Sequence, residues 1–306
     1  MKLTSIITVN YHQTALTIDL LRSLVRHAAN DAIEVIVVDN GSTDDQESVF
    51  RAVYPEVVYL RAETNLGFAG GNNLGIKHAK GDYLLFLNND TEITAGFVGS
   101  LRNELERHPD IGLLSPLILY FDDQTKIQYA GFTPMNYLTG RNKGIGQMES
   151  DDGQYDDLTV ETGYCHGAAM ICRSADLQRV GLMEEHFFLY YEELDWCEKF
   201  KRAGLKTGFT GKAKIYHKES MSVGRESPLK SYFMTRNRWL FIRRNAKRGT
   251  AIAFSCYYLF FATPFLLIKY AAKGRFDLIT AALRGIGWNL TQATNSRHLG
   301  VKLPGA

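Results

Sequence analysis

The stretch LLFLNNDTE at residues 84–92 brings polar side chains directly after an uninterrupted apolar run. Asn88 and Asn89 suit a tight turn, because asparagine tolerates left-handed backbone and hydrogen-bonds its own main chain. Asp90 suits a divalent cation, because carboxylate oxygen is the ligand that Mg²⁺ and Mn²⁺ prefer. The stretch therefore indicates either a turn or a metal-binding site at the end of a buried strand.

A second group of acids stands in YYEELDWCEKF at residues 190–200, where the apolar spacing predicts the start of a helix. Glu192 and Asp195 share one helical face, and Glu193 lies about 100° round from Glu192. Acids in a first turn favour the helix dipole, which is a purely structural explanation. A carboxylate among aromatic residues also suits a general base that takes a proton from a hydroxyl.

The elements that would position these groups alternate through the first 120 residues. We expect strands at 5–9, 34–39, 57–60, 83–87 and 111–119, and helices at 14–27, 44–52, 71–80 and 97–108. Strands without polar alternation, separated by helices, indicate a parallel sheet that is covered on both faces. Ligands of such sheets bind at the carboxyl ends of the strands. Polar clusters follow three of these ends: Asn10, DNGSTD (39–44) and NNDTE (88–92).

Composition and missing motifs exclude several classes. The net charge of +2 gives no bulk argument for binding nucleic acid. No glycine turn follows the first strand, where a dinucleotide-binding domain requires one, and no phosphate-binding P-loop motif is present. The four cysteines form no CxxC pair and are expected to be buried thiols of a reducing compartment. The start of the chain lacks signal-peptide features, which favours a cytoplasmic domain.

Four motifs stand in the order SIITVNYH, VIVVDNGSTD, ETNLGFAGGNNLGI and GDYLLFLNNDTEI. They resemble inverting glycosyltransferases of family 2, most closely the rhamnosyltransferase-like branch that builds bacterial surface polysaccharides. The resemblance continues through residues 167–206 and covers roughly residues 3–220. It implies an α/β chain of GT-A fold, with a Rossmann-like, mostly parallel central sheet flanked by helices. The implied division is a domain at 1–225, whose halves 1–120 and 121–225 bind nucleotide and acceptor, and a helical tail at 226–306.

The resemblance also implies roles for particular residues. A first set would contact the nucleotide-sugar donor: Thr8, Asn10, Asp39, Ser42, Asn65, Gly70, Asn73, Asn88 and Asn89. For Asp39, capping of the helix after DNGSTD is the alternative, although Ser42 or Thr43 is the more natural cap.

The NNDTE motif corresponds to the family's Asp-x-Asp motif, in which a carboxylate holds Mg²⁺ or Mn²⁺ against the two phosphates of the donor. Asn88 stands at the first Asp position, so Asp90 is the only charged ligand that the motif offers. His217 falls where the family often supplies a metal-binding histidine. Without the resemblance, a lone histidine after a strand would be a structural residue.

The family places its base at the second residue of a Glu-Asp pair, two positions before another aspartate. Counting back from Asp195 gives Glu193, with Glu192 as the alternative because the position holds Glu rather than Asp. Asp195 would then orient the helix or the acceptor. Residues 121–163 are polar and irregular, so we expect an exposed loop that shapes acceptor binding or is simply solvated.

The tail has a different character. RNRWLFIRRNAKR (236–248) carries basic residues with interleaved aromatics, and an uncharged run follows from Gly249 to Ile268 with Pro264 inside it. We expect residues 228–275 to bind anionic lipid at the cytoplasmic face without crossing, because Pro264 would interrupt a spanning helix. A buried core helix is the alternative. Basic residues flank the run on both sides: Arg243, Arg244, Lys247, Arg248, Lys269, Lys273 and Arg275.

These features together favour a metal-assisted inverting glycosyltransferase at the inner face of the cell membrane. Its partners would be a nucleotide sugar, plausibly dTDP-rhamnose, and a lipid-linked glycan or polysaccharide acceptor, with no nucleic acid. A transferase that uses a UDP-linked sugar is one alternative. A catalytically inactive scaffold that binds nucleotide sugars is the other, because Asn88 replaces an acid.

Overall fold

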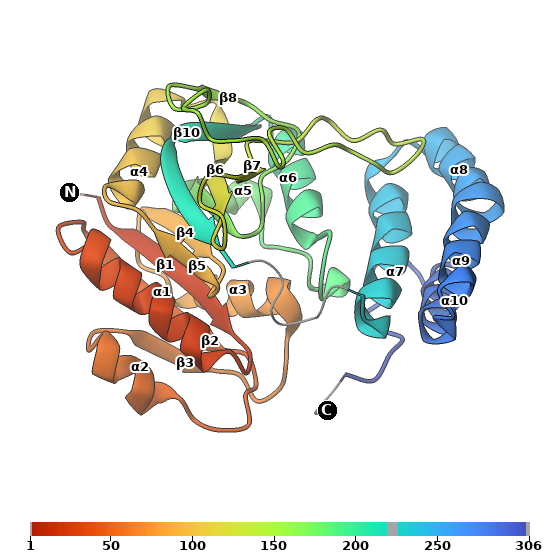
Figure 1. The fold of residues 1–306 in the computed structure, drawn as a ribbon, viewed down its shortest axis with the longest axis horizontal. Helices are drawn as coiled ribbons and strands as arrows, with labels where there is room; N and C mark the ends of the chain where they lie inside the picture. Colours follow the sequence, from red (N-terminus) through yellow and green to blue (C-terminus); the bar gives the residue numbers. More distant parts are fainter. Residues whose placement is uncertain (1, 219–225, 304–306) are drawn as a thin grey trace.

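One ten-stranded sheet forms the centre of the molecule in the computed structural model, which describes residues 2–218 and 226–303 (Figure 1). Eight strands follow in the order β3-β2-β1-β4-β9-β6-β10-β5, while β7 pairs with β6 and β8 pairs with β10. The strands are β1 Thr4–Asn10, β2 Ile33–Asp39, β3 Val58–Arg61, β4 Tyr83–Leu87, β5 Thr91–Ile93, β6 Ile111–Tyr120, β7 Ile127–Tyr129, β8 Thr159–Glu161, β9 Ala169–Arg173 and β10 Lys206–His217.

The strand directions decide which segments meet at the edge of the sheet. Strands β3, β2, β1 and β4 are mutually parallel, so their carboxyl ends share one edge. Strand β9 runs antiparallel to β4, with Ala169 opposite Leu87. The chain that enters β9 therefore lies beside the chain that leaves β4, and Asn88 N donates to Ala168 O over 2.9 Å.

Helices cover both faces of the sheet. They are α1 Thr14–His27, α2 Glu47–Val53, α3 Gly67–His78, α4 Phe97–Arg107, α5 Leu177–Val180 and α6 Glu192–Arg202. One core cluster joins Ile6 and Val37 to α1 and α4, and the other joins Ile7 and Phe86 to α3 and α6. Alternate residues of the same strand are buried on opposite faces, which explains why the strands read as continuous apolar runs.

The glycines of NLGFAGGNNLG belong to a helix that presses closely on the sheet. Helix α3 begins at Gly67 rather than at residue 71, as the sequence had led us to expect. A Cβ atom on Gly75 would lie 2.4 Å from Ile7 Cγ2, and one on Gly71 would lie 2.9 Å from Val9 Cγ1. Glycine is therefore required at these positions for the helix to approach β1.

Several expected boundaries and environments are wrong. Helix α2 begins at Glu47 instead of residue 44, because the preceding residues form a hydrogen-bonded loop around Asp39. The segment 121–163 contains β7 and β8 and buries Ile127 and Tyr129, so it is not wholly an exposed loop. Cys256 is exposed, whereas Cys165, Cys172 and Cys197 are buried as expected.

Four helices follow the sheet and pack beside it as a separate layer in Figure 1. They are α7 Pro228–Asn245, α8 Arg248–Tyr257, α9 Thr263–Ala272 and α10 Phe276–Thr291. A π-helical turn at Tyr258–Ala262 joins α8 to α9, so that one helix of 25 residues runs over Arg248–Ala272.

Pro264 does not interrupt the apolar run, which corrects the sequence expectation. It sits in the first turn of α9, directly after the π-helical turn, where altered hydrogen bonding accommodates the missing N–H group. The 25-residue helix has a mean hydropathy of 1.9 and is long and apolar enough to cross a membrane, by length and composition only. Only 17% of its most apolar window is buried, so it is not a core helix.

Candidate active site

A cavity of about 850 Å³ opens at the carboxyl edge of β1, β2 and β4. Its opposite wall comes from the loop at 166–168, from the segment 188–190 and from the first turn of α6. The structure brings these sequence-predicted site residues to its lining: Asn65, Asn88, Asn89, Asp90, Glu192, Glu193 and His217. Groups that are far apart in the sequence thus face one space.

Asp90 and His217 form a close pair at one side of this cavity. Strand β5 starts directly after Asp90 and pairs with the end of β10, with Thr91 opposite His217. His217 Nε2 lies 3.2 Å from Asp90 Oδ1, and both atoms are buried. Within residues 2–218 and 226–303, neither atom has a hydrogen-bond partner of acceptable geometry.

Gln128 defines how His217 is oriented. Its Oε1 atom lies 2.8 Å from His217 Nδ1, so a proton on Nδ1 donates to it, and in the neutral tautomer that this bond selects the lone pair of Nε2 faces Asp90. A lone pair and a carboxylate oxygen side by side in a buried place suit a cation between them, with the histidine held by a second residue behind it. The pair therefore fits Mg²⁺ or Mn²⁺.

The protein supplies few ligands for such an ion. The described part of the chain contains no cluster of three or more His, Cys, Asp or Glu side chains that could hold a metal. A cation at Asp90 and His217 would complete its coordination with oxygens from the donor phosphates and water.

His166 is a wall residue that the sequence did not single out as a site residue. Its ring lies 5.9 Å from the ring of His217 and stacks on Phe132. Ala168 N donates to His166 Nδ1 over 3.1 Å, which fixes the ring. Burial lowers the pKa of His166 to about 3, and the nearby His217 adds to this, so the imidazole is neutral. The only sequence signal was its position beside Gly167.

Glu193 and Glu192 lie at the other side of the cavity, at the start of α6. A Cβ atom on Gly167 would lie 3.7 Å from Glu193 Cγ, so the loop at 166–168 packs directly against this end of α6. Burial raises the pKa of the Glu193 carboxyl. Burial raises the pKa of Glu192 further, and the neighbouring Glu193 adds to the rise.

The segment that leads into α6 holds an uncommon backbone conformation. Three of its residues have positive φ angles without being glycine: Phe188 (65°), Tyr190 (69°) and Tyr191 (75°). Asn237 on α7 stabilises this conformation, because its Nδ2 donates to the carbonyl oxygens of Phe187, Leu189 and Tyr190 over 2.8–2.9 Å. Strained backbone that is held in this way occurs at functional sites. Sequence reasoning had assigned this part of α7 to lipid binding.

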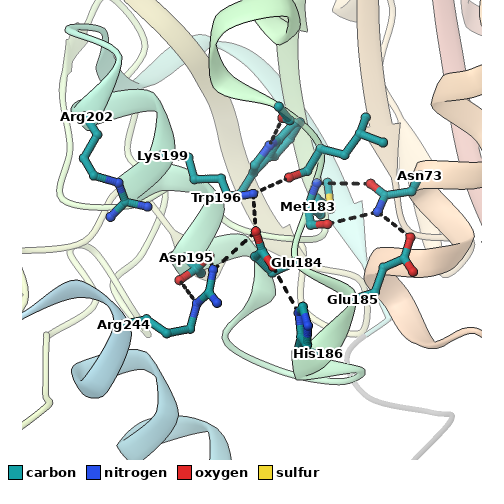
Figure 2. Close-up of polar contacts among 12 residues, drawn as sticks. Asn73, Met183, Glu184, Glu185, His186, Asp195, Trp196, Lys199, Arg202 and Arg244 are labelled. Carbon is teal, nitrogen blue, oxygen red and sulfur yellow. Dashed lines mark hydrogen bonds and ion pairs between the residues drawn. The ribbon is translucent and has the colours of Figure 1, made fainter. Parts of the chain in front are cut away.

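Asp195 is not part of the cavity lining and points toward Arg244 of α7, as Figure 2 shows. It is fully buried, and its Oδ1 accepts from Arg244 Nε over 3.1 Å and from Asn245 Nδ2 over 2.8 Å. Arg244 also pairs with Glu184 at 3.3 Å. Asp195 therefore ties α6 to α7, and Arg244 is used inside the protein rather than at a lipid surface.

The remaining predicted donor residues are not part of the cavity lining, and several of them form hydrogen bonds within the protein. Asp39 Oδ1 accepts from Ser42 N at 3.2 Å and its Oδ2 from Tyr59 at 2.9 Å, and α2 begins too late for Asp39 to cap it. Asn73 clamps Met183 through both ends of its amide (Figure 2). The residues that are not in the lining are Thr8, Asn10, Asp39, Ser42, Gly70 and Asn73.

Asn40 is a cavity residue that was missed within DNGSTD. Its Nδ2 donates to Asn65 Oδ1 and to Gly67 O, both over 3.1 Å, and its Oδ1 accepts from Leu66 N. It thereby fixes the turn before α3, and the signal for it was its place directly after Asp39 at a strand end.

Residues 5–179, more than half of the chain, match the family model described as Glycosyl transferase family 2. The chain belongs to glycosyltransferase family 2. A low-salt glycan biosynthesis hexosyltransferase of Haloferax volcanii is 27% identical over 241 residues, which are 77% of this chain and 74% of the relative. An N-acetylglucosaminyl-diphospho-decaprenol L-rhamnosyltransferase of Mycobacterium tuberculosis is 24% identical over 218 residues, 65% of this chain and 71% of the relative.

Solved structures show that this glycosyltransferase has the GT-A fold. A mannosyltransferase from Pyrobaculum calidifontis, solved with GDP-Man and Mn²⁺, matches 95% of this chain and 76% of its own with a TM-score of 0.57 at 14% identity. GalNAc-T7, solved with UDP, GalNAc and Mn²⁺, matches 79% of this chain with a TM-score of 0.64 at 14% identity. The chain spans about half the length of GalNAc-T7 (48%).

Proposed function

We propose that this family 2 glycosyltransferase transfers a hexose or deoxyhexose with inversion, from a nucleotide sugar to a lipid-linked or polysaccharide acceptor of surface glycan synthesis. One observation carries the proposal. The unsatisfied Asp90–His217 pair and Glu193 line the same cavity. A cation-binding side and a base-bearing side are what a direct displacement at an anomeric carbon requires.

The chain's own residues would divide the reaction as follows. Asp90 and His217 would hold the divalent cation, which would offset the charge that develops on the departing nucleoside diphosphate. Glu193 accepts the proton of the acceptor hydroxyl as this hydroxyl attacks, and its raised pKa makes it a stronger base than an ordinary glutamate. Burial and the neighbouring Glu193 raise the pKa of Glu192 more than that of Glu193, so Glu193 is the acid of the two that gives up its proton first.

Rhamnose from dTDP-rhamnose is the donor that we propose first, because the relative from Mycobacterium tuberculosis is named an L-rhamnosyltransferase. A UDP-linked sugar is the alternative, since GalNAc-T7 was solved with UDP. Thermal-shift measurements with dTDP, UDP and GDP sugars separate the two, because a ligand that binds only the folded state raises the midpoint.

Release of nucleoside diphosphate tests the function itself. Purified chain with Mn²⁺, the donor chosen by thermal shift and a membrane extract as acceptor should release nucleotide, and EDTA should stop the release. Donor binding without any release, in the presence of acceptor, would identify an inactive scaffold instead. Release that persists in EDTA would contradict the metal role of Asp90.

We also propose that the glycosyltransferase lies on the inner face of the cell membrane, with α8–α9 in the plane of the surface. Its outward side carries Phe260, Phe261, Phe265 and Ile268, which are 68–72% exposed. The other side is bonded to α7: Trp239 Nε1 donates to Ser255 Oγ over 2.9 Å, and Tyr258 donates to Thr235 O over 3.1 Å. A position across the membrane would remove the helix from these partners on α7. Helix α7 is needed at its present place, because its Asn237 also holds the backbone that precedes Glu193.

Fewer basic residues beside this helix are available to bind anionic headgroups than the sequence indicated. Arg243 donates to Asn289 O and Gln292 O, and Arg244 pairs with Asp195, so neither is available to headgroups. Lys273 pairs with Glu226 and Arg275 with Asp277, so Lys247, Arg248 and Lys269 are the flanking cations that remain without an ion pair to the described residues. We therefore expect that high salt leaves most of the protein on membranes, whereas Phe261→Ser with Phe265→Ser releases it. Cleavage of a C-terminal tag from outside intact cells would show that the helix spans.

A further inference from the structure

A second cavity, of about 270 Å³, lies between the loop at 140–142, Tyr191 and the helices α7 and α8–α9. Two guanidinium groups line it, those of Arg141 and Arg238, and no Asp or Glu is part of the lining. The other lining groups are amide, hydroxyl and apolar: Gly140, Asn142, Tyr191, Ser231, Met234, Thr235, Tyr258, Leu266 and Tyr270. We call this space the arginine cavity.

Neither arginine is neutralised within the described ranges 2–218 and 226–303. Arg238 Nη2 donates to Thr139 O, which fixes its position, while its buried Nε atom has no partner there. Arg141 is exposed and makes no side-chain hydrogen bond or ion pair with the described residues. By contrast, Arg244 on the same helix as Arg238 pairs with two carboxylates. Two guanidinium groups that lack a carboxylate partner in one hollow suit an oxyanion, because the planar fork of arginine matches phosphate geometry.

The arginine cavity lies between the residue that precedes the catalytic acids and the apolar helix. Tyr191 directly precedes Glu192, and Glu192 and Glu193 line the large cavity on its other side. The opposite wall is formed by Leu266 and Tyr270 of α9, next to Phe265, which is 71% exposed.

The loop that carries Arg141 is built to reach this place. It extends from the sheet across to α8 in Figure 1. Gly140, at φ 61°, packs so closely on α8 that a Cβ atom there would lie 2.8 Å from Phe254 Cε2. Asn136 closes the loop, with its backbone N–H donating to Arg141 O and its carbonyl accepting from Gly140 N. The loop is therefore fixed against the helix with Arg141 at the mouth of the cavity.

We propose that the arginine cavity binds the phosphate of a lipid-phosphate-linked acceptor. Arg141 and Arg238 hold the phosphate or diphosphate, the lipid chain lies along α8–α9, and the sugar that the phosphate carries reaches past Tyr191 to Glu193. This rests on the proposed function and adds to it the chemical class of the acceptor and the residues that select it. A soluble polysaccharide would leave both guanidinium groups without a negatively charged partner.

The same chemistry occurs in the headgroup of an anionic phospholipid. The position of Tyr191 favours the acceptor, because a site for headgroups alone gains nothing from sharing a wall with the catalytic acids. Farnesyl diphosphate, a short lipid diphosphate, represents the acceptor in an experiment, and phosphatidylglycerol in nonionic micelles represents the headgroup.

Binding of these probes to the full chain in nonionic detergent tests the proposal by calorimetry, with EDTA present so that a metal-bound donor site does not contribute. Farnesyl diphosphate should bind, whereas farnesol and inorganic diphosphate bind much more weakly. Arg141→Gln and Arg238→Gln should each weaken farnesyl diphosphate binding about ten- to a hundredfold, which is the expected loss of a charged hydrogen bond. Arg284→Gln, which removes an exposed arginine from α10, is the matched control and should change nothing.

Three results would overturn the proposal. One is unchanged farnesyl diphosphate binding in both variants; another is competition by dTDP or UDP, which would place the probe in the large cavity. The third is equal dependence of phosphatidylglycerol binding on both arginines, without preference for the diphosphate, which would assign the cavity to headgroups. Arg141→Gln is the cleaner variant, since Arg238 also holds the loop. Nucleotide release with donor and membrane extract is measured in parallel, so that failure of the subsite and failure of the transferase are told apart.

Discussion

The carboxyl edge of the sheet contains two regions that use polar side chains in opposite ways. Around Asp39 and Asn10, the side chains satisfy one another: Asp39 accepts from Ser42 and Tyr59, and Asn10 accepts from Thr17. Around Asp90, the side chains face the cavity with buried atoms that the described chain does not satisfy. Buried polar groups are almost always paired in folded proteins. The unpaired atoms of Asp90 and His217, which line the cavity, are therefore the ones that we expect a ligand to satisfy.

Substitution of Asp90 gives the largest effect that this comparison predicts. Asp90 is the only carboxylate of NNDTE in the cavity lining. Asp90→Ala removes it, so the rate of transfer should fall roughly 10³-fold or more. Because the Oδ1 atom makes no hydrogen bond within the described chain, the thermal midpoint should hardly change. Calorimetry should show that Mn²⁺ no longer strengthens nucleotide binding.

The matched control for this variant is Asp110→Ala. Asp110 pairs with Lys206 on the surface, before β6 and away from the carboxyl edge. It should leave both transfer and Mn²⁺ dependence intact. An Asp90→Ala protein in which Mn²⁺ still strengthens nucleotide binding would refute the idea that unsatisfied atoms mark the metal site.

Substitution of Glu193 should give the next largest effect on transfer. Glu193→Gln keeps the shape and removes basicity, so transfer should fall roughly 10²–10⁴-fold while donor binding persists. In the unaltered protein, the raised pKa of Glu193 places the acid limb of the transfer rate above the ordinary glutamate value of 4.5, and activity falls as the pH drops through that raised value. Glu193→Gln should abolish this limb in a pH profile of kcat/KM.

Glu192→Gln separates the two neighbours. The folded pKa of Glu192 lies above its unfolded value, so its contribution to stability is complete below about pH 4.5 and is lost as the pH rises through the folded pKa. Replacing it should make the thermal midpoint less sensitive to rising pH and reduce transfer by less than Glu193→Gln does. The reverse ranking of the two transfer rates would move the base to Glu192.

Sequence patterns predicted the strand ends well because the burial of both sheet faces leaves continuous apolar runs, as in β1, β2 and β4. They also led to His217, Asp90 and the acids of α6, which the structure brings to one cavity. They did not show that Asn237 stabilises the segment before α6, or that Arg243 and Arg244 are used internally. Those roles depend on how α7 packs against residues 187–195, and no local spacing encodes that contact.

Asp195 gives the smallest expected effect on transfer and sharpens the comparison within α6 itself. It lies two residues beyond Glu193, yet it is buried against Arg244 and Asn245 instead of facing the cavity (Figure 2). Breaking a buried ion pair from one side leaves an uncompensated charge and costs about 3–5 kcal/mol. Glu184 still pairs with Arg244, so Asp195→Ala should lose about 3 kcal/mol of unfolding free energy, at the lower end of that range. Urea unfolding measures this loss, with the surface variant Asp110→Ala as the reference that changes little.

Transfer per folded molecule, measured at low temperature, should stay within a fewfold of the unaltered protein, because Asp195 does not line the cavity. A hundredfold drop in transfer by fully folded Asp195→Ala protein would mean that Asp195 acts in the reaction. It would also mean that hydrogen-bond satisfaction does not distinguish structural from reactive carboxylates on α6.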